Sequence, residues 1–184
     1  YFTNAIGTRT RGLDLRLDYS REMDRGARLK LVAAYQRSRT RITELNQAPE
    51  VLGVNMTDLI LDPFTRVLIE GSQPADAIKL WSRYSHGSYD LVLNLNRFGK
   101  FHSVSAYDRV TFSAKWTLDA ELCLRLAKDV TLALGGVNLF DVRPDKWGQT
   151  DDSLVGAGKV IQYSQYAPFG YNGASYYLRL GVNF

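Results

Sequence analysis

The sequence has a single cysteine, only 5 prolines and no long apolar run. One cysteine excludes an internal disulfide framework and a cysteine-based zinc site. A transmembrane helix needs about 20 consecutive, mostly apolar residues, and no such stretch occurs. The first residues also lack the charged start, apolar stretch and cleavage site of a signal peptide. Residues 1–12, "YFTNAIGTRTRG", look like a start inside a sheet, so we expect a fragment, or a processed C-terminal portion, of a longer protein.

The charge is also modest, at +4, and its arginines are spread along the chain. A nucleic-acid-binding protein would show a compact basic tract, so we expect no nucleic-acid partner. What the chain does have is 11 Tyr, 8 Phe, 3 Trp and 15 Gly. This composition suits sheets and turns better than helices.

Apolar and polar residues alternate along several segments, which indicates strands with one apolar face. In 13–19, leucines and Tyr19 alternate with charged residues, and the same period resumes in 29–36. Pairing Tyr19 with Leu29 would join these two segments into a hairpin with a continuous apolar face. Further strands are predicted at 77–85, 89–98, 110–126, 130–140 and 175–184. The pattern therefore predicts an all-β fold, an antiparallel up-and-down meander of about seven strands.

The connections between the predicted strands alternate in length. Short connections fall at 20–27, 86–88 and 127–129, and long ones at 45–76, 99–109 and 141–173. Transmembrane β-barrels have short periplasmic turns and long extracellular loops, and their strands need about 9–11 residues. A barrel wall therefore explains both the loop alternation and the strand lengths, with an apolar face toward lipid and a polar face toward the lumen.

Two other architectures remain open. A soluble antiparallel sandwich would bury the apolar face and leave the charged face in water. A separate small barrel of eight strands, acting as an adhesin or structural anchor, would need one more strand at residues 1–7 and a closed seam.

Two stretches and the C-terminal strand resemble a known family. They are "TRTRGLDLRLDYS" (8–20), "LALGGVNLFDVRPDKW" (132–147) and the terminal strand that ends in Phe184. Together they resemble the C-terminal third of a TonB-dependent outer-membrane receptor. The resemblance implies that residues 1–184 form the last seven strands of a 22-stranded transmembrane β-barrel in the bacterial outer membrane, with the plug domain absent from this chain.

The resemblance also implies a function and a set of partners. Such receptors take up a scarce ligand, most often a ferric siderophore, with energy supplied by TonB acting on the plug. The expected partners are outer-membrane lipid and lipopolysaccharide, the outer-membrane assembly machinery, the missing plug and barrel strands, and TonB in the full-length protein. The assembly signal of the terminal strand comprises Tyr176, Leu178, Leu180, Val182 and Phe184.

Arginines continue the apolar phase of the first two predicted strands. They are Arg9, Arg11, Arg37, Arg39 and Arg41. In the predicted register Arg11 faces Arg37 and Arg9 faces Arg39, and such like-charge pairs are unfavourable without counter-charges or water. We hypothesise contacts to lipopolysaccharide phosphates. A solvated extension of the strands is the alternative.

The long segment 141–173 carries aromatic residues that could stack on a siderophore or sugar. Its candidate ligand-binding residues are Trp147, Tyr163 and Tyr166, with packing inside the loop as the alternative. Asp151 and Asp152 lack further spaced oxygen ligands. His102 and Ser103 are adjacent and would point to opposite faces of a strand. We therefore expect no catalytic residue, metal or cofactor, and no enzyme activity.

Overall fold

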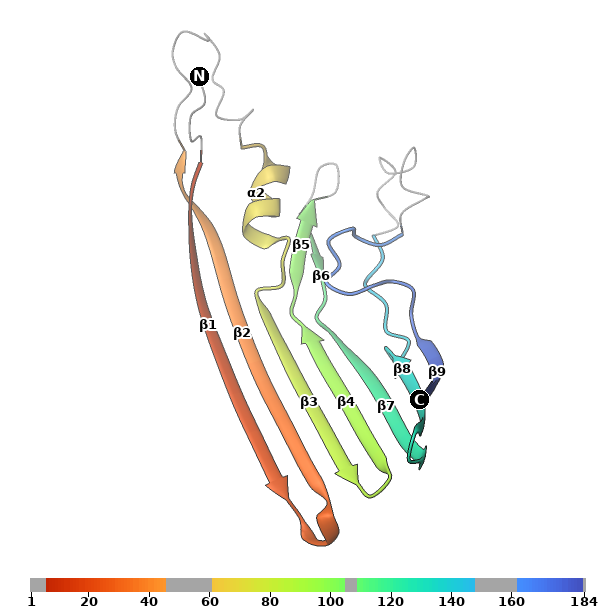
Figure 1. Ribbon diagram of the computed structural model, residues 1–184. Coiled ribbons are helices and arrows are strands. Elements are labelled where there is room, and N and C mark those ends of the chain that lie inside the picture. The colour runs from red at the N-terminus through yellow and green to blue at the C-terminus, as the bar shows by residue number, and fades with distance from the viewer. Residues whose placement is uncertain (1–5, 46–60, 105–108, 148–161, 184) are drawn as a thin grey trace, which may run out of the picture.

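The computed structural model describes residues 6–45, 61–104, 109–147 and 162–183. These residues form a seven-stranded antiparallel sheet (Figure 1). Its strands lie side by side in the order in which they occur along the chain. Its strands, in order, are β1 (Ile6–Glu22), β2 (Arg28–Leu45), β3 (Asp76–His86), β4 (Tyr89–Phe98), β7 (Lys115–Ala127), β8 (Val130–Val137) and β9 (Ser175–Val182). The predicted all-β antiparallel meander of seven strands is confirmed.

The alternation of short and long connections is confirmed as well. The three short turns lie together at one end of the sheet, and the long connections lie at the other (Figure 1). The β1–β2 turn contains a short 3-10 helix, Asp24–Gly26, where Arg25 and Gly26 have φ values of 63° and 77°. The β3–β4 turn uses Gly87 at φ 53°. These left-handed residues let the chain reverse within a few positions.

The register of the first hairpin differs from the predicted one by two residues. Tyr19 lies opposite Leu31, and not opposite Leu29. The strands run further toward the turn than expected, up to Glu22 opposite Arg28, and an ion pair of 2.8 Å joins these two side chains. Because side chains alternate with a period of two, a shift of two residues keeps the predicted apolar face intact.

The strand predicted at 110–126 is two separate strands. β6 (Arg109–Phe112) pairs with β5 (Phe101–Val104) in a small hairpin, whereas β7 belongs to the main sheet. The break falls at 113–114, where the Ser113 N–H donates to the Asp145 carboxylate instead of to a neighbouring strand. β8 also ends at Val137, earlier than the predicted 140, because Asn138 takes a left-handed φ of 53°.

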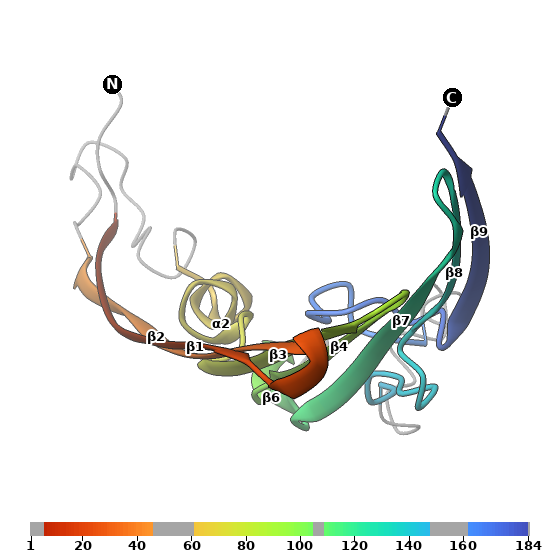
Figure 2. The ribbon, with the colours of Figure 1, turned by 60° about the horizontal axis from the view of Figure 1, so that its bottom comes forward.

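A helix, α2 (Pro63–Gly71), lies in the connection where only a loop was predicted. The Asp62 carboxylate caps it by accepting from Phe64 N at 2.8 Å and Thr65 N at 3.0 Å, and proline stands at its first position. Glu70 accepts the N–H of Ile42 at 2.9 Å and so ties the helix to β2. α2 lies over the hollow side of the sheet (Figure 2).

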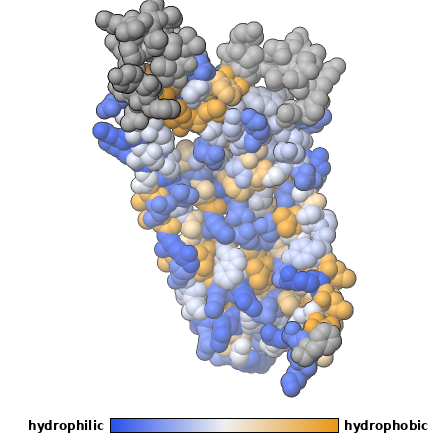
Figure 3. Space-filling view, turned by 45° about the horizontal axis from the view of Figure 1, so that its top comes forward, coloured by the Kyte–Doolittle hydropathy of each residue, from blue (hydrophilic) through white to orange (hydrophobic). Residues whose placement is uncertain are grey.

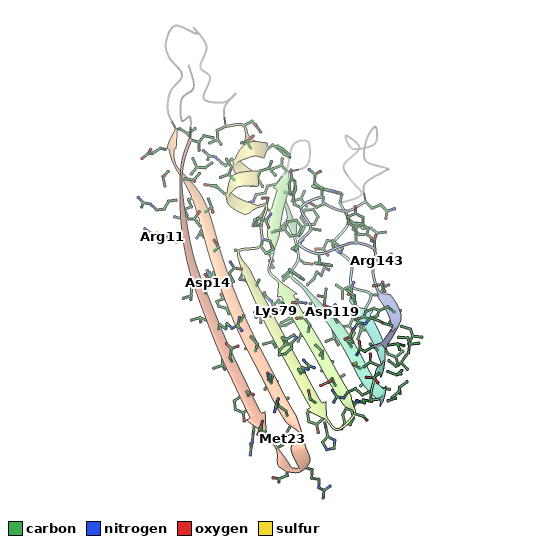
Figure 4. All side chains as sticks on the ribbon, in the orientation of Figure 1. Arg11, Asp14, Met23, Lys79, Asp119 and Arg143 are labelled. Atoms are coloured by element: carbon green, nitrogen blue, oxygen red, sulfur yellow. The ribbon has the colours of Figure 1, made fainter. Side chains whose placement is uncertain are left out.

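The sheet is curved into an open trough with two unlike faces (Figure 2). The register places one run of apolar residues on the convex face across all seven strands; examples are Leu17, Ala33, Leu80, Leu95 and Leu118, and further along Leu122, Leu134 and Leu178. The concave face is largely hydrophilic (Figure 3). Asp14, Lys79 and Asp119 belong to it, on β1, β3 and β7 (Figure 4).

The convex face has no protein cover within the described ranges. Leu17 is 69% exposed and Leu178 66%. Buried apolar residues are few; they are Ala27, Leu61, Phe101, Phe112 and Ala133. The chain exposes 13471 Å², against about 9,000 Å² for a compact domain of the same mass. The sheet therefore has a large apolar face that none of the described residues covers.

Candidate functional site

An aromatic cluster stands above the trough at the long-connection end. Phe112 is buried; its ring stacks on Phe101 at 4.7 Å and meets Trp147 edge-on at 5.1 Å. The backbone N–H of Trp147 donates to Gln162 at 3.1 Å, which joins the segment after β8 to the segment before β9. Trp147 is thus placed by the β5–β6 hairpin and by a backbone bond, and it remains partly exposed.

The other two aromatic candidates lie in the segment that leads into β9. Tyr163 forms a backbone bridge with Lys146 and stacks on Tyr171 at 5.7 Å. Tyr166 donates its N–H to the Ser164 hydroxyl at 3.2 Å, and Ser164 is completely buried. The structure therefore joins the two backbone segments that carry Trp147 and Tyr163, but the two rings pack on different partners, Trp147 on Phe112 and Tyr163 on Tyr171. Ligand stacking by Trp147, Tyr163 and Tyr166 stays a prediction; Asp151 and Asp152 lie outside the described residues.

The motif "VNLFD" ties this region to the sheet through Asn138. Its side-chain amide donates to the Val142 carbonyl at 2.7 Å and accepts from Val142 N at 3.0 Å. Its own N–H donates to Asp119 on β7 at 2.8 Å. Asp141, at φ 51°, accepts from Ala174 N at 2.9 Å, immediately before β9. Asn138 and Asp141 thus fix the exit of β8 and the entry to β9.

Asp145 anchors the same segment to the start of β7. Its carboxylate receives the Lys115 ammonium at 2.6 Å and the Ser113 N–H at 2.5 Å. Burial raises the pKa of Asp145, but the hydrogen bonds from Lys115 and Ser113 outweigh burial and hold the pKa below its ordinary value. The charged carboxylate is the form that these two donors stabilise.

Docking of this segment should therefore depend on pH. Since the folded pKa is depressed, the stabilisation is complete above the ordinary aspartate value of about 3.9 and is lost as pH falls through the folded pKa. We expect amide exchange at Ser113, corrected for its intrinsic pH dependence, to lose protection in that acidic range. In Asp145→Asn the protection should be low already at neutral pH, and Asp129→Asn, at an exposed turn, should behave as wild type. Unchanged protection in Asp145→Asn would contradict this account.

Ionic pairs line the concave face below the loops. Asp90, which is buried, lies between Arg83 at 3.4 Å and Arg125 at 3.3 Å. Nearer to β9, Glu121 accepts from Tyr177 at 2.6 Å and Arg179 at 2.9 Å. The alternation of polar and apolar residues assigns these charged side chains to one face of the sheet. Which of them pair depends on the register of the strands, which the sequence does not specify. Such a face suits contact with water or with polar protein groups.

The five arginine candidates lie on β1 and β2 toward the long-connection end. The structure pairs Arg11 with Arg39 and Arg9 with Arg41, so the predicted pairs Arg11–Arg37 and Arg9–Arg39 are wrong by the same two-residue shift. Arg37 lies opposite Leu13 and Asp76. Lipopolysaccharide contact by these residues remains a prediction.

The predicted assembly signal lies on β9, at one edge of the sheet. Tyr176, Leu178, Leu180 and Val182 share the convex face and are exposed, at 71%, 66%, 63% and 47%. Phe184 lies outside the described residues. β9 pairs with β8 on one side, and within the described part of the chain its other side has no strand.

The histidines offer no catalytic arrangement among the described residues. His102 Nδ1 lies 3.0 Å from the Thr111 hydroxyl, and burial together with nearby Arg109 lowers the pKa of His102. Ser103 is buried and lies opposite Val110 in the ladder, away from Thr111. No group of three or more metal-ligating side chains occurs in the described part of the chain.

Comparisons with known proteins leave the assignment to the chain's own features. The chain matches no protein-family model, and it matches no curated protein. Within the described residues, no helix is both long and apolar enough to cross a membrane.

Proposed function

We propose that this chain is part of the wall of a 22-stranded transmembrane β-barrel in the bacterial outer membrane. In this proposal the parent protein is a TonB-dependent receptor that takes up a scarce ligand, most often a ferric siderophore. The chain supplies the last seven strands, and the plug domain and the other barrel strands complete the receptor. The assembly machinery engages β9 during insertion.

The observation that carries the proposal is the uncovered apolar convex face behind a polar concave face. A soluble sandwich would cover the apolar face with a second sheet, and the described residues form no such sheet. Lipid chains can cover the broad apolar convex face. A water-filled or plug-filled lumen can hold the paired charges of the concave face, such as Asp90 with Arg125. A barrel wall therefore accounts for both faces at once.

The edges of the sheet favour a large barrel over a small closed one. β1 and β9 each pair with one strand in the described part of the chain, and they do not pair with each other. In the trough of Figure 2 these two edges stand apart, on opposite rims. Because a barrel leaves no unpaired edge, strands from outside the chain would have to join both rims.

The two ends of the sheet indicate how the proposed barrel is oriented in the membrane. The short turns suit the periplasmic side, and the long connections with α2 and the aromatic cluster suit the extracellular side. There Trp147 and Tyr163 lie on two segments joined by the backbone bridge between Lys146 and Tyr163, and each aromatic ring could stack on flat conjugated or sugar groups of a ligand. The ligand would then pass inward between the polar concave face and the plug domain of the full-length receptor.

The proposal is tested with the full-length protein that contains this chain. Bacteria that carry or lack the gene are grown under iron limitation, and uptake of iron-55 presented as ferric siderophores is measured with and without a protonophore. We expect the protein in the outer-membrane fraction and an uptake that requires both the gene and the proton gradient. A soluble protein would contradict the barrel, and an outer-membrane protein whose deletion leaves uptake unchanged across the siderophores tried would contradict the transport role.

A further inference from the structure

Four arginines form a compact group on the convex face, which we call the arginine quartet: Arg9, Arg11, Arg39 and Arg41. In the ladder Arg9 lies opposite Arg41 and Arg11 opposite Arg39, and all four are exposed. Opposed residues in adjacent strands have Cβ atoms about 5 Å apart, and alternate residues along one strand lie about 7 Å apart. The quartet therefore concentrates four positive charges at the corners of a small rectangle.

The protein does not neutralise these charges in its described part. None of the eight salt bridges there involves a member of the quartet. Three acids lie near the quartet. Asp76 pairs with Arg97, Glu70 accepts the N–H of Ile42, and Glu44 lies opposite Gly7. On the opposite face of the same ladder, the hydroxyls of Thr10 and Thr40 are bonded at 2.8 Å. The backbone thus holds like charges face to face, an unfavourable arrangement that water or an external anion can offset.

The chemistry of guanidinium groups specifies the anion. Each presents a planar fork of donors that matches two oxygens of a phosphate, and such charge-assisted bonds are stronger than neutral ones. Two phosphates carried on one molecule could each sit between an opposed pair. A single carboxylate would leave half of the quartet without a partner.

The position of the quartet specifies what carries the phosphates. Leu13, Leu15 and Leu17 follow Arg9 and Arg11 along the same face of β1, and all three are more than half exposed. Arg11 lies in the part of β1 nearer to the long connections (Figure 4). A molecule bound here would meet cations at one end and an apolar wall directly below, which is the layout of a phosphorylated lipid with its acyl chains.

We propose that the arginine quartet is a binding site for the phosphorylated sugar headgroup of a membrane glycolipid, lipopolysaccharide, whose acyl chains lie along the apolar convex face of β1 and β2. This inference rests on the proposed placement in the outer membrane but not on transport. The proposed site contains four of the five arginines predicted from the sequence. Arg37 is left out because it lies opposite Leu13 and Asp76, outside the rectangle.

The test compares two variants of equal charge in the full-length protein, purified in a neutral detergent. The first replaces the quartet: Arg9→Gln, Arg11→Gln, Arg39→Gln and Arg41→Gln. The control replaces four exposed cations elsewhere: Arg25→Gln, Lys30→Gln, Lys79→Gln and Lys128→Gln. Affinity is measured for purified lipopolysaccharide, for the same lipopolysaccharide after phosphatase treatment, for phosphatidylglycerol and for inorganic pyrophosphate. Circular dichroism verifies that each variant is folded.

We expect the quartet variant and the dephosphorylated glycolipid each to weaken binding by about tenfold or more, and the control variant to bind as wild type. Replacing the quartet by lysine should restore part of the affinity, because charge is retained and the bidentate fork is lost. Equal binding by the quartet variant would overturn the proposal, as would phosphatidylglycerol or pyrophosphate binding as tightly as lipopolysaccharide. If the full-length protein transports its ligand but the quartet variant binds lipopolysaccharide as wild type, the quartet proposal is wrong and the proposed transport function stands.

Discussion

Leu93→Arg is expected to lower the free energy of unfolding in lipid bilayers by about 2–4 kcal/mol, the cost of a cation on the lipid face of a barrel near mid-depth. Leu93 lies in the middle of β4, opposite Ser82 on β3 and Ala120 on β7. It is 36% exposed on the convex face, with Leu91 and Leu95 on either side of it along the strand. An arginine there would have no water and no acid within the apolar band.

The matched control is the adjacent residue on the other face of the same strand. Val92 is also apolar, but it lies opposite Arg83 and Glu121 on the polar concave side. Val92→Arg should therefore cost far less than Leu93→Arg. Urea titration of the full-length protein folded into phospholipid vesicles, followed by tryptophan fluorescence, measures both. Equal costs for the two variants would argue against a lipid-covered convex face.

Asn138→Ala is expected to destabilise the protein by about 3 kcal/mol. The substitution removes both side-chain hydrogen bonds to Val142, worth about 1 kcal/mol each. It also places alanine at a φ of 53°, which costs about 1 kcal/mol more than for asparagine. Since Asn138 joins β7, β8 and the entry to β9, the loss should appear first as fraying of β9.

Two further variants separate the causes of that loss. Asn138→Gly tolerates the left-handed backbone and loses only the side-chain bonds, so it should cost about 1 kcal/mol less than alanine. Asn172→Ala makes the same chemical change at an exposed loop position and should have little effect. The measurements are urea titration and amide exchange along β9. If Asn138→Ala matched Asn172→Ala, the role assigned to Asn138 would be wrong.

The sheet could be predicted because its signal is repeated in every strand. Alternation in segments such as 13–19 and 89–98 assigns each residue to a face without knowledge of its partner. The exact register could not be predicted, because a shift of two residues preserves the same alternation. What fixes it is the turn: Arg25 and Gly26 in left-handed conformations shorten the turn and extend both strands toward it.

The sequence does contain a signal for the helix α2, but it lies between two segments with a strong strand pattern. Asp62 followed by Pro63 is a typical helix start, and apolar residues recur with helical spacing to Leu68. A stretch between two strong strands is readily assigned to a loop when it lacks their period. The hydrogen bond from Ile42 N–H to Glu70 joins residues far apart in the sequence, so no local sequence pattern predicts it.

The candidate sites were predictable to different degrees. The aromatic residues Trp147 and Tyr163 could be chosen from composition, but their packing on Phe112 and Tyr171 requires the β5–β6 hairpin and the bridge to Lys146. The arginines were visible as a continuation of the apolar phase. Only the observed register identifies which four of them form opposed pairs. Pairing across strands is a tertiary property, and it decides the chemistry of each site.

The most direct test of the account asks which face of the sheet meets lipid. In a Cys123→Ser background, nitroxide labels are attached separately at Leu93→Cys and Asn96→Cys, which lie on opposite faces of β4. The full-length protein is placed in lipid vesicles, and collisions of each label with oxygen and with a water-soluble nickel chelate are measured. If the convex face meets lipid, the label at 93 will collide with oxygen and be shielded from nickel, relative to the label at 96. Equal access of nickel to both labels would contradict it.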